Sequence, residues 1–266
     1  MPQIIINRSS LHYVLDPGPV ANPHFLTVIF IHGSGNSSRR WQRQFPVSHT
    51  LASVAGELEP ERIQFIALDL PGHAASEGEG CRTVQEYVEV IDQFVQALGL
   101  HKVVLVGNSL GGAIALQAAL AFPPWLKGIG LVGTGAKLRV LPTILDQLAA
   151  NIMPENLIAM SYSRSTPKEL IEEIEADLSL TSNAVRLRDL LACDEFDIRT
   201  RLPEISIPSL IVVGEEDQLT PVKYAEYLNT NLGNATMVKI ARAGHMVMYE
   251  QPDRFNQTLA EFLSVL

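Results

Sequence analysis

The stretch Lys102-Val-Val-Leu-Val-Gly-Asn-Ser-Leu-Gly-Gly112 decides the fold of this chain. Its apolar run, Val103 to Val106, is mostly β-branched, which is typical of a strand buried on both faces of a parallel sheet. The Ala- and Leu-rich segment from Gly112 to Phe122 follows at once and predicts a helix that ends before Pro123. The sequence therefore predicts that a strand turns directly into a helix around Ser109.

Ser109 lies in the middle of this turn, in the pattern Gly107-x-Ser109-x-Gly111. So abrupt a turn requires a strained backbone at the serine, and glycines at Gly107 and Gly111 remove the side chains that would clash across it. The hydroxyl of Ser109 would then stand at a helix N-terminus, where backbone N–H groups point outward. An ordinary turn with a capping serine has the same five-residue pattern, but the flanking strand and helix favour a nucleophile.

This strand, turn and helix resemble the nucleophile elbow of the α/β-hydrolase family. The resemblance implies the α/β-hydrolase fold, with a mostly parallel eight-stranded sheet flanked by helices. It also implies a Ser-Asp-His triad in that order along the chain, and an oxyanion loop after an earlier strand. Ser109 would be the nucleophile.

The composition is that of a folded globular protein: among 266 residues, 47% are hydrophobic and 18% are charged. The net charge of −9 argues against nucleic acid as a partner, because binding phosphates needs a surplus of Lys and Arg. No apolar run approaches the roughly 20 residues of a membrane span. The N-terminus shows no signal peptide pattern, so we expect a cytoplasmic protein. Cys81 and Cys193 fit no metal-ligand spacing and are expected to be free thiols.

The rest of the chain alternates between strand and helix patterns, which predicts a parallel sheet with right-handed crossovers. An N-terminal antiparallel hairpin precedes it. The expected strands are 4–6, 11–15, 26–31, 63–68, 103–106, 126–132, 209–213 and 235–240. The expected helices are 83–98, 112–122, 221–232 and 254–266, and residues 41–58 are expected to be helical with irregularities.

The pattern changes between residues 136 and 203. This stretch has no convincing strand but four helical segments, at about 142–151, 155–162, 167–180 and 182–193. It resembles the helical cap that α/β-hydrolases carry over the active site, although extra surface helices would give the same pattern. We therefore expect an all-helical cap at 136–203 inserted into a core formed by 1–135 and 204–266.

Two further strand ends carry residues suited to catalysis, since ligands in open α/β sheets bind beyond the carboxyl ends of the strands. Asp217 lies in Gly214-Glu-Glu-Asp-Gln-Leu-Thr-Pro221, which is similar to the acid loop of the family. His245 lies in Ala243-Gly-His-Met246, which resembles its base loop. Asp217 would orient the imidazole of His245 and stabilise it when charged. A helix N-terminal acid is the structural alternative for Asp217, and Glu215 and Glu216 are close enough to compete.

Of the seven histidines, only His245 combines a strand end with a position after the acid. The other six lie at positions less suited to a base: His12 in the hairpin, His24 and His49 in loops, His73 in a Pro-Gly turn, His101 before the central strand, and His32 in the oxyanion segment.

The segment His32-Gly33-Ser34-Gly35, which follows the strand at 26–31, resembles the oxyanion segment of the family. The resemblance implies that the backbone N–H groups of Ser34 and Leu110 would stabilise the oxyanion. His32 would hold the loop, and the small residues Gly33 and Gly35 would let its backbone approach the substrate.

These groups predict a serine hydrolase that forms an acyl-enzyme on Ser109 and needs neither a metal nor a cofactor. The expected substrate is a small, fairly apolar carboxylic ester, since the cap supplies apolar side chains at Leu145, Leu148, Ile152, Met153, Leu157, Ile158, Met160 and Tyr162. Most of these are expected in the core of the cap. A carbon–carbon bond hydrolase, a lactonase, a thioesterase and a slow-turnover ligand receptor remain alternatives. Met246 stands where the carbon–carbon hydrolases usually have a tryptophan, which disfavours the first of these. The oligomeric state stays open.

Overall fold

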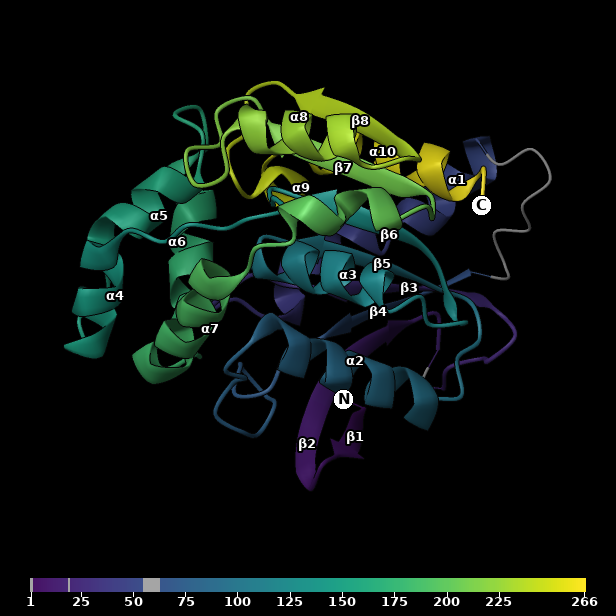
Figure 1. Ribbon diagram of the computed structural model, residues 1–266, viewed down its shortest axis with the longest axis horizontal. Helices are drawn as coiled ribbons and strands as arrows, with labels where there is room; N and C mark the ends of the chain where they lie inside the picture. Colours follow the sequence, from purple (N-terminus) through teal and green to yellow (C-terminus); the bar gives the residue numbers. More distant parts are fainter. Residues whose placement is uncertain (1, 19, 55–62) are drawn as a thin grey trace.

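The computed structural model describes residues 2–18, 20–54 and 63–266, and in that part of the chain the strands form one eight-stranded sheet (Figure 1). The strand order is β1-β2-β4-β3-β5-β6-β7-β8. The pairs β1–β2 and β2–β4 are antiparallel, and each later neighbouring pair is parallel. The predicted α/β-hydrolase sheet with its N-terminal hairpin is therefore confirmed.

The strands closely follow the predicted ones. Their bounds are β1 Gln3–Ile6, β2 Ser9–Asp16, β3 Leu26–Ile31, β4 Ile63–Leu68, β5 Val103–Asn108, β6 Leu126–Val132, β7 Ser209–Gly214 and β8 Ala235–Ile240. In β3, β4, β5 and β7 nearly every residue is buried, since helices cover both faces of the sheet.

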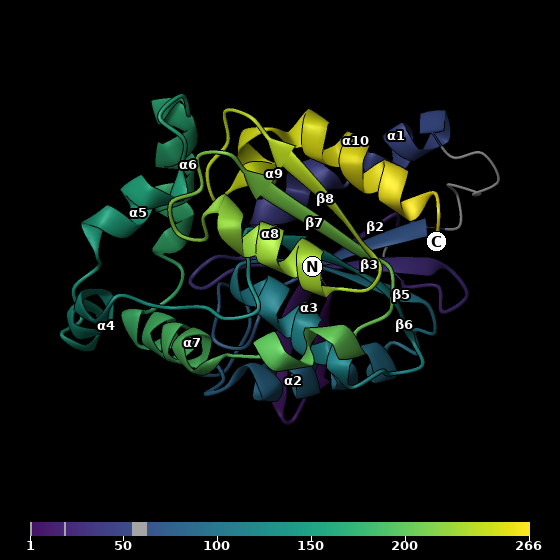
Figure 2. The same ribbon diagram turned by 45° about the horizontal axis from the view of Figure 1, so that its top comes forward.

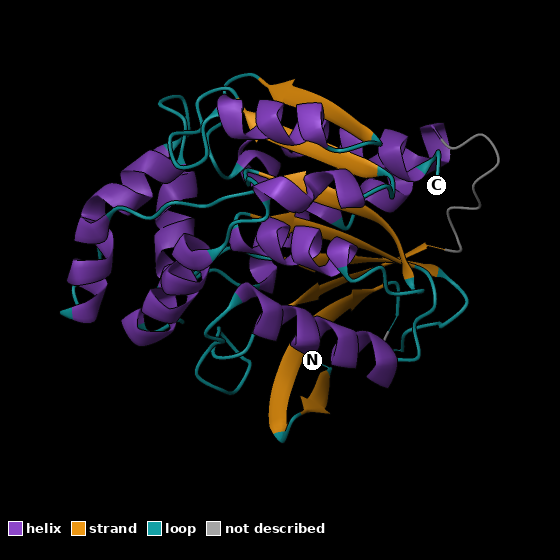
Figure 3. Cartoon of the chain, viewed as in Figure 1, coloured by secondary structure: helices purple, strands orange, loops and turns teal. Residues whose placement is uncertain are grey.

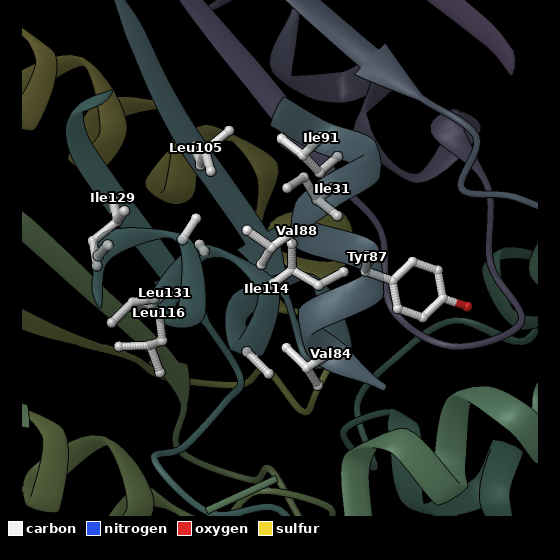
Figure 4. Packing of buried hydrophobic residues seen from close by; sticks show 14 of the residues in the cluster. Ile31, Val84, Tyr87, Val88, Ile91, Leu105, Ile114, Leu116, Ile129 and Leu131 are labelled. Carbon is white, nitrogen blue, oxygen red and sulfur yellow. The ribbon is translucent and has the colours of Figure 1, made fainter. Parts of the chain in front are cut away.

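Helices lie on both faces of the sheet (Figure 3). Two hydrophobic clusters fill the spaces between the sheet and these helices. Alternate strand residues point to opposite faces, so Ile29 and Leu105 join one cluster while Phe30 and Val104 join the other. The first cluster includes side chains of α2 (Val84–Ala97), α3 (Leu110–Leu120) and α8 (Val222–Asn231), and Figure 4 shows its centre. The second includes side chains of α1 (Val47–Val54), α9 (Val247–Glu250) and α10 (Pro252–Leu263).

The stretch predicted to be helical with irregularities from Trp41 is helical and interrupted in its described part. The chain forms a 3₁₀ helix, η1, at Ser38–Gln44, three residues earlier than predicted, and then α1 at Val47–Val54. Pro46 lies between them, where its missing N–H cannot extend a helical hydrogen-bond ladder. The predicted continuation to Leu58 lies outside the described residues.

The stretch between β6 and β7 contains the helices α4 (Pro142–Ala149), α5 (Glu155–Ser161), α6 (Lys168–Leu178), α7 (Asn183–Glu195) and the 3₁₀ helix η3 (Arg199–Glu204). Helices α4 to α7 gather beside one end of the sheet (Figures 1 and 2). The division into core and cap stays a prediction, with which this arrangement is compatible.

The turn between β5 and α3 is strained at Ser109, whose φ is 54° and ψ is −115°. Its N–H donates to the carbonyl of Val132 at 2.9 Å, which ties the turn to the end of β6. A Cβ on Gly107 would lie 2.1 Å from the backbone of Gly111, and a Cβ on Gly111 would lie 2.2 Å from the carbonyl oxygen of Ile31. Backbone atoms therefore occupy the space where a Cβ of Gly107 or of Gly111 would lie, and no side chain fits at either glycine.

We expect Gly111→Ala to lower the free energy of unfolding by about 3 kcal/mol, because the added methyl group must displace the backbone of β3. Urea denaturation measures the change. Gly233→Ala is the matched control, since a Cβ there meets nothing closer than 3.9 Å, and its effect should stay within about 1 kcal/mol. Equal effects of the two substitutions would contradict the tight turn.

Candidate active site

The structure brings Asp217 and His245 into direct contact at the ends of neighbouring strands. Asp217 follows β7 and His245 follows β8, and the two strands pair in parallel. Oδ2 of Asp217 lies 2.9 Å from Nδ1 of His245. A carboxylate can only accept this hydrogen bond, so Nδ1 carries the proton and Nε2 keeps a free lone pair.

The carboxylate of Asp217 is buried and fully engaged. Its Oδ1 accepts the N–H groups of Leu219 (2.9 Å) and Thr220 (2.8 Å), and its Oδ2 accepts the Thr220 hydroxyl (2.8 Å). Burial alone would raise the pKa of Asp217, but the charge of a protonated His245 and these hydrogen bonds outweigh it and lower the pKa. Asp217 therefore stays ionised at neutral pH. Glu215 and Glu216, the predicted competitors, have no such contact with His245.

Ser109 and His245 line one cavity between the sheet and helices α5 to α7. The side chain of Asn108, the residue before Ser109, links this turn to the backbone of His245. Its Nδ2 donates to the carbonyl oxygens of His245 and Val132, both at 3.2 Å. The cavity is lined by Gly33, Ser34, Asn36, Asn108, Ser109, Met153, Leu157, Ile158, Ser161, Tyr162, Leu178, Arg186, Leu190, Leu219, His245 and Met246. The predicted nucleophile and base thus face the same space.

The predicted oxyanion residues also lie here. Ser34 lines the cavity, and a Cβ on Gly33 would lie 3.2 Å from Cβ of Ser109, so the loop runs close past the serine. Leu110 is the first residue of α3. The ring of His32 spans the base of the loop, because its Nδ1 donates to the Gly33 carbonyl at 2.8 Å and its Nε2 accepts the Leu70 N–H at 3.0 Å.

A buried carboxylate on α7, which the sequence analysis missed, contacts this loop from the other side. Oδ2 of Asp189 accepts the N–H of Gly35 at 3.2 Å and Nε2–H of His73 at 2.9 Å. Its Oδ1 accepts the Tyr87 hydroxyl at 2.5 Å, and the Ser34 side chain also hydrogen-bonds to it. One side chain from residues 136–203 therefore joins the oxyanion segment, the turn at His73 and α2.

The surroundings of His73 favour its protonated form. Its Nδ1 lies 3.1 Å from the carbonyl oxygen of Pro71 and its Nε2 lies 2.9 Å from Asp189, while the N–H of Gly35 lies 3.3 Å from the same Nε2. Burial alone would lower the pKa of His73, but the Asp189 carboxylate outweighs it and raises the pKa. Burial and the neighbouring charge of His73 lower the pKa of His32 to about 4. Two histidines whose pKa values shift in opposite directions, with ring centroids 4.8 Å apart, therefore brace the same loop.

The sequence did contain a signal for Asp189. The residues Val185, Arg186, Asp189, Ala192 and Cys193 of α7 are buried, and Val185, Asp189 and Ala192 have the spacing of one helix face. A carboxylate on a buried helix face needs a partner. His73 was assigned only to a turn because nothing in the sequence reveals that α7 passes over it.

The apolar residues of 136–203 include both core and cavity wall. Met153, Leu157, Ile158 and Tyr162 line the cavity beside Ser109, while Tyr162 also belongs to the second hydrophobic cluster and Ile158 packs against it. Leu148 is buried elsewhere and Ile152 is 55% exposed. Helical spacing shows which residues share a face but not whether that face meets another helix or a cavity.

Within the described residues, no three His, Cys, Asp or Glu side chains are grouped so that they could hold a metal ion. Cys81 and Cys193 are buried and not joined in a disulfide. In the same part of the chain, no helix has the length and apolar character needed to cross a membrane.

Residues 28–258 match the model of the alpha/beta hydrolase family, which covers most of the chain. The protein therefore belongs to the α/β-hydrolase family and is a hydrolase by that membership.

Relatives and solved structures with several activities are similar to this chain. A 2-hydroxy-6-oxononadienedioate/2-hydroxy-6-oxononatrienedioate hydrolase of Paraburkholderia phymatum is 28% identical, with 89% of this chain and 86% of that protein covered. A structure of a thermophilic esterase is 31% identical with a TM-score of 0.78, and 99% of this chain and 97% of that chain are covered. An enol-lactonase from Burkholderia xenovorans LB400 shares the fold, with a TM-score of 0.84, 19% identity and coverage of 99% and 100%.

Asp189→Asn should lower the free energy of unfolding by about 3–5 kcal/mol at pH 6, because it leaves a charged His73 buried without its carboxylate. Because the pKa of His73 is raised in the folded state, its protonation stabilises the fold. This contribution is complete below the ordinary pKa of 6.5 and is lost as the pH rises through the folded-state pKa. Because the pKa of Asp189 is lowered in the folded state, its ionisation stabilises the fold above about pH 4. The difference between variant and wild type should therefore be greatest between about pH 4 and 6.5 and shrink at higher pH.

Urea denaturation from pH 5 to pH 9 measures this profile. Glu195→Gln is the matched control, since Glu195 is an exposed acid on the same helix. A loss that does not vary with pH, or one shared by the control, would contradict the charged pair.

Proposed function

We propose that the protein hydrolyses carboxylic esters of small, fairly apolar substrates, with Ser109 as nucleophile, His245 as base and Asp217 as the acid that orients the base. One observation carries this proposal. Nδ1 of His245 is engaged by Asp217, which leaves Nε2 of that ring available to accept a proton, and His245 and Ser109 line the same cavity. A base with an anionic partner beside a strained serine is the arrangement that nucleophilic catalysis requires.

In the first step, Nε2 of His245 takes the hydroxyl proton as Oγ of Ser109 bonds to the ester carbonyl carbon. The tetrahedral intermediate collapses, the alcohol leaves with the proton from His245, and an acyl-serine remains. Water then attacks the acyl carbon, His245 accepts its proton and returns it to Oγ, and the carboxylic acid departs. Asp217 stays ionised throughout and stabilises the imidazolium in both steps.

The oxyanion that forms in each step needs donors that are already in place, and we propose the backbone N–H groups of Ser34 and Leu110. The position of Ser34 on the cavity wall and of Leu110 at the start of α3 supports this role. Gly33 allows the loop to approach the serine. Each such donor is worth about 3 kcal/mol of transition-state stabilisation.

The wall of the cavity favours an apolar substrate. Around Ser109 it presents aliphatic side chains from α5 and α7, namely Leu157, Ile158 and Leu190. The thioethers of Met153, which precedes α5, and Met246, which follows His245, add to this wall. The thermophilic esterase at 31% identity also supports ester hydrolysis. A lactone or a thioester presents the same carbonyl to the same groups, so lactonase and thioesterase activities remain related alternatives.

Carbon–carbon bond hydrolysis is the second candidate, because the relative from P. phymatum is named for it. Asn108 precedes the serine here, as in the carbon–carbon hydrolases that this turn resembles. Met246 lines the cavity directly after the histidine, in place of the tryptophan usual in those enzymes. Ester cleavage is therefore the better supported proposal.

We expect wild-type protein to hydrolyse p-nitrophenyl esters of short and medium acyl chains, and Ser109→Ala to lower kcat/KM by about 10³-fold or more, because triad members act as a unit. The release of p-nitrophenolate measures the rate across an acyl-length series. A fluorophosphonate probe should label wild type at Ser109 and leave the variant unlabelled.

Ser179→Ala, which removes an exposed hydroxyl at the end of α6, is the control and should hydrolyse the esters like wild type. Absence of Ser109-dependent turnover would reject the esterase proposal. Rapid labelling combined with cleavage of a vinylogous 1,5-diketone instead of esters would favour the carbon–carbon hydrolase. Labelling with hardly any turnover of either substrate would favour a slow ligand receptor.

A further inference from the structure

Ser109 also lines a second cavity, which extends away from the first toward the beginning of α8. Leu157, Leu190 and Leu219 border both cavities, so the two meet at the serine. The second cavity has an apolar wall from the segment that enters α4 and from α5, formed by Leu138, Val140, Leu141, Ile144 and Met160. A substrate whose carbonyl lies at Ser109 could therefore extend a chain along this wall.

A groove lined by four cationic side chains adjoins the outer part of this second cavity. Arg139, Lys223 and Tyr224 border both the cavity and the groove. Lys137 and Arg199 complete the cations of the groove, and the described residues that line either space include no Asp or Glu. In a chain of net charge −9, four of the 20 Lys and Arg side chains thus gather beside one cavity.

Two of these cations have a carboxylate partner and two do not. Asp197 pairs with both Lys137 and Arg199, in each case at 2.8 Å. Within the described part of the chain, Arg139 and Lys223 form no ion pair, and both are exposed. Asp194 faces the same region, but its Oδ1 accepts the N–H of Val140. Two unpaired cations therefore stand where the apolar cavity opens.

We infer that the substrate carries an anionic group, a carboxylate or a phosphate, at the end remote from the scissile carbonyl, and that Arg139 and Lys223 bind it. This inference rests on the proposed hydrolysis at Ser109 and adds the charge of the substrate. An apolar chain fits the wall between the serine and the cations, and the anion would replace the missing carboxylate partners. Cations at a cavity mouth also attract anionic ligands before they bind.

The test compares matched anionic and neutral substrates. To test for an anion on the acyl side, p-nitrophenyl monoesters of C7 to C10 dicarboxylic acids, whose far end is a carboxylate, are compared with the corresponding esters whose far end is a carboxamide. On the leaving-group side, acyl esters of 4-hydroxybenzoate are compared with those of 4-hydroxybenzamide. For phosphate, S-acyl 4′-phosphopantetheine is compared with S-acyl pantetheine. The ratio of kcat/KM, anionic over neutral, is the measured quantity for each pair.

In wild type this ratio should exceed one for at least one pair, and it should fall between 50 and 500 mM NaCl because salt screens exposed charges. Arg139→Ala combined with Lys223→Ala should lower the ratio by about 5- to 10-fold, since each exposed charge contact contributes only a few-fold. Arg139→Lys should retain most of it. Lys127→Ala is the matched control, because it removes an exposed cation near the opposite end of β6, and it should leave the ratio unchanged.

A wild-type ratio of one or less for every pair, or a ratio that the double variant leaves unchanged, would overturn the inference. A binding measurement distinguishes failure of this inference from failure of the proposed hydrolysis. Calorimetric titration of Ser109→Ala with suberic acid monoethyl ester and with its neutral carboxamide analogue requires no turnover. Tighter binding of the anion, weakened by the double variant, would support the anion site even if no ester were hydrolysed. Equal binding of the two ligands, together with a ratio of one or less for every substrate pair, would reject it.

Discussion

The backbone turn at Ser109 is the constraint on which the rest of this structure depends. A non-glycine residue at φ 54° is disfavoured by about 1–3 kcal/mol, so it persists only where the surroundings enforce it. Here Val132 accepts the Ser109 N–H, and the Thr134 hydroxyl donates to the Ser109 carbonyl at 2.9 Å. Both contacts come from β6 and the loop behind it, so the neighbouring strand holds the serine in place. The glycines on either side then allow α3 to pack directly against β5 and β3.

Two carboxylates join the sheet and the helical segment 136–203 on opposite sides of the site. Asp189 reaches from α7 to the oxyanion segment at Gly35. Glu250 reaches in the other direction, since it accepts the N–H of Gly244 beside His245 and also contacts Ser163 and Thr166. Movement of the helical segment would therefore disturb both the base loop and the oxyanion loop. The site is assembled between two parts of the chain, and its geometry depends on both.

Much of the fold could be predicted from the sequence because its signals are local. The apolar run before Gly107 and the alternation of strands and helices each report on one element and its neighbours. The side-chain network around Asp189 and His73 joins residues 116 positions apart, and no local pattern links them. The same holds for Leu157 and Ile158 of α5, whose helical spacing is equally compatible with core and with cavity wall. The proposed triad lies between these cases, since strand ends narrow the candidates but only the folded chain brings Asp217 and His245 together.

The sheet and residues 136–203 contribute different side chains to the two cavities, and this difference bears on substrate specificity. The ends of the sheet strands carry the proposed triad of Ser109, Asp217 and His245, which would act on any activated carbonyl. Residues 136–203 supply much of the surrounding wall, where Leu157 and Leu190 border both cavities and Arg139 stands at the outer opening, so we propose that they distinguish one carbonyl compound from another. Relatives with the same sheet can therefore cleave lactones, esters or carbon–carbon bonds. For this chain, the wall changes from apolar at the serine to exposed cations at the opening that have no ion pair among the described residues, and this favours the proposed amphipathic substrate, because its anionic end could pair with Arg139 and Lys223.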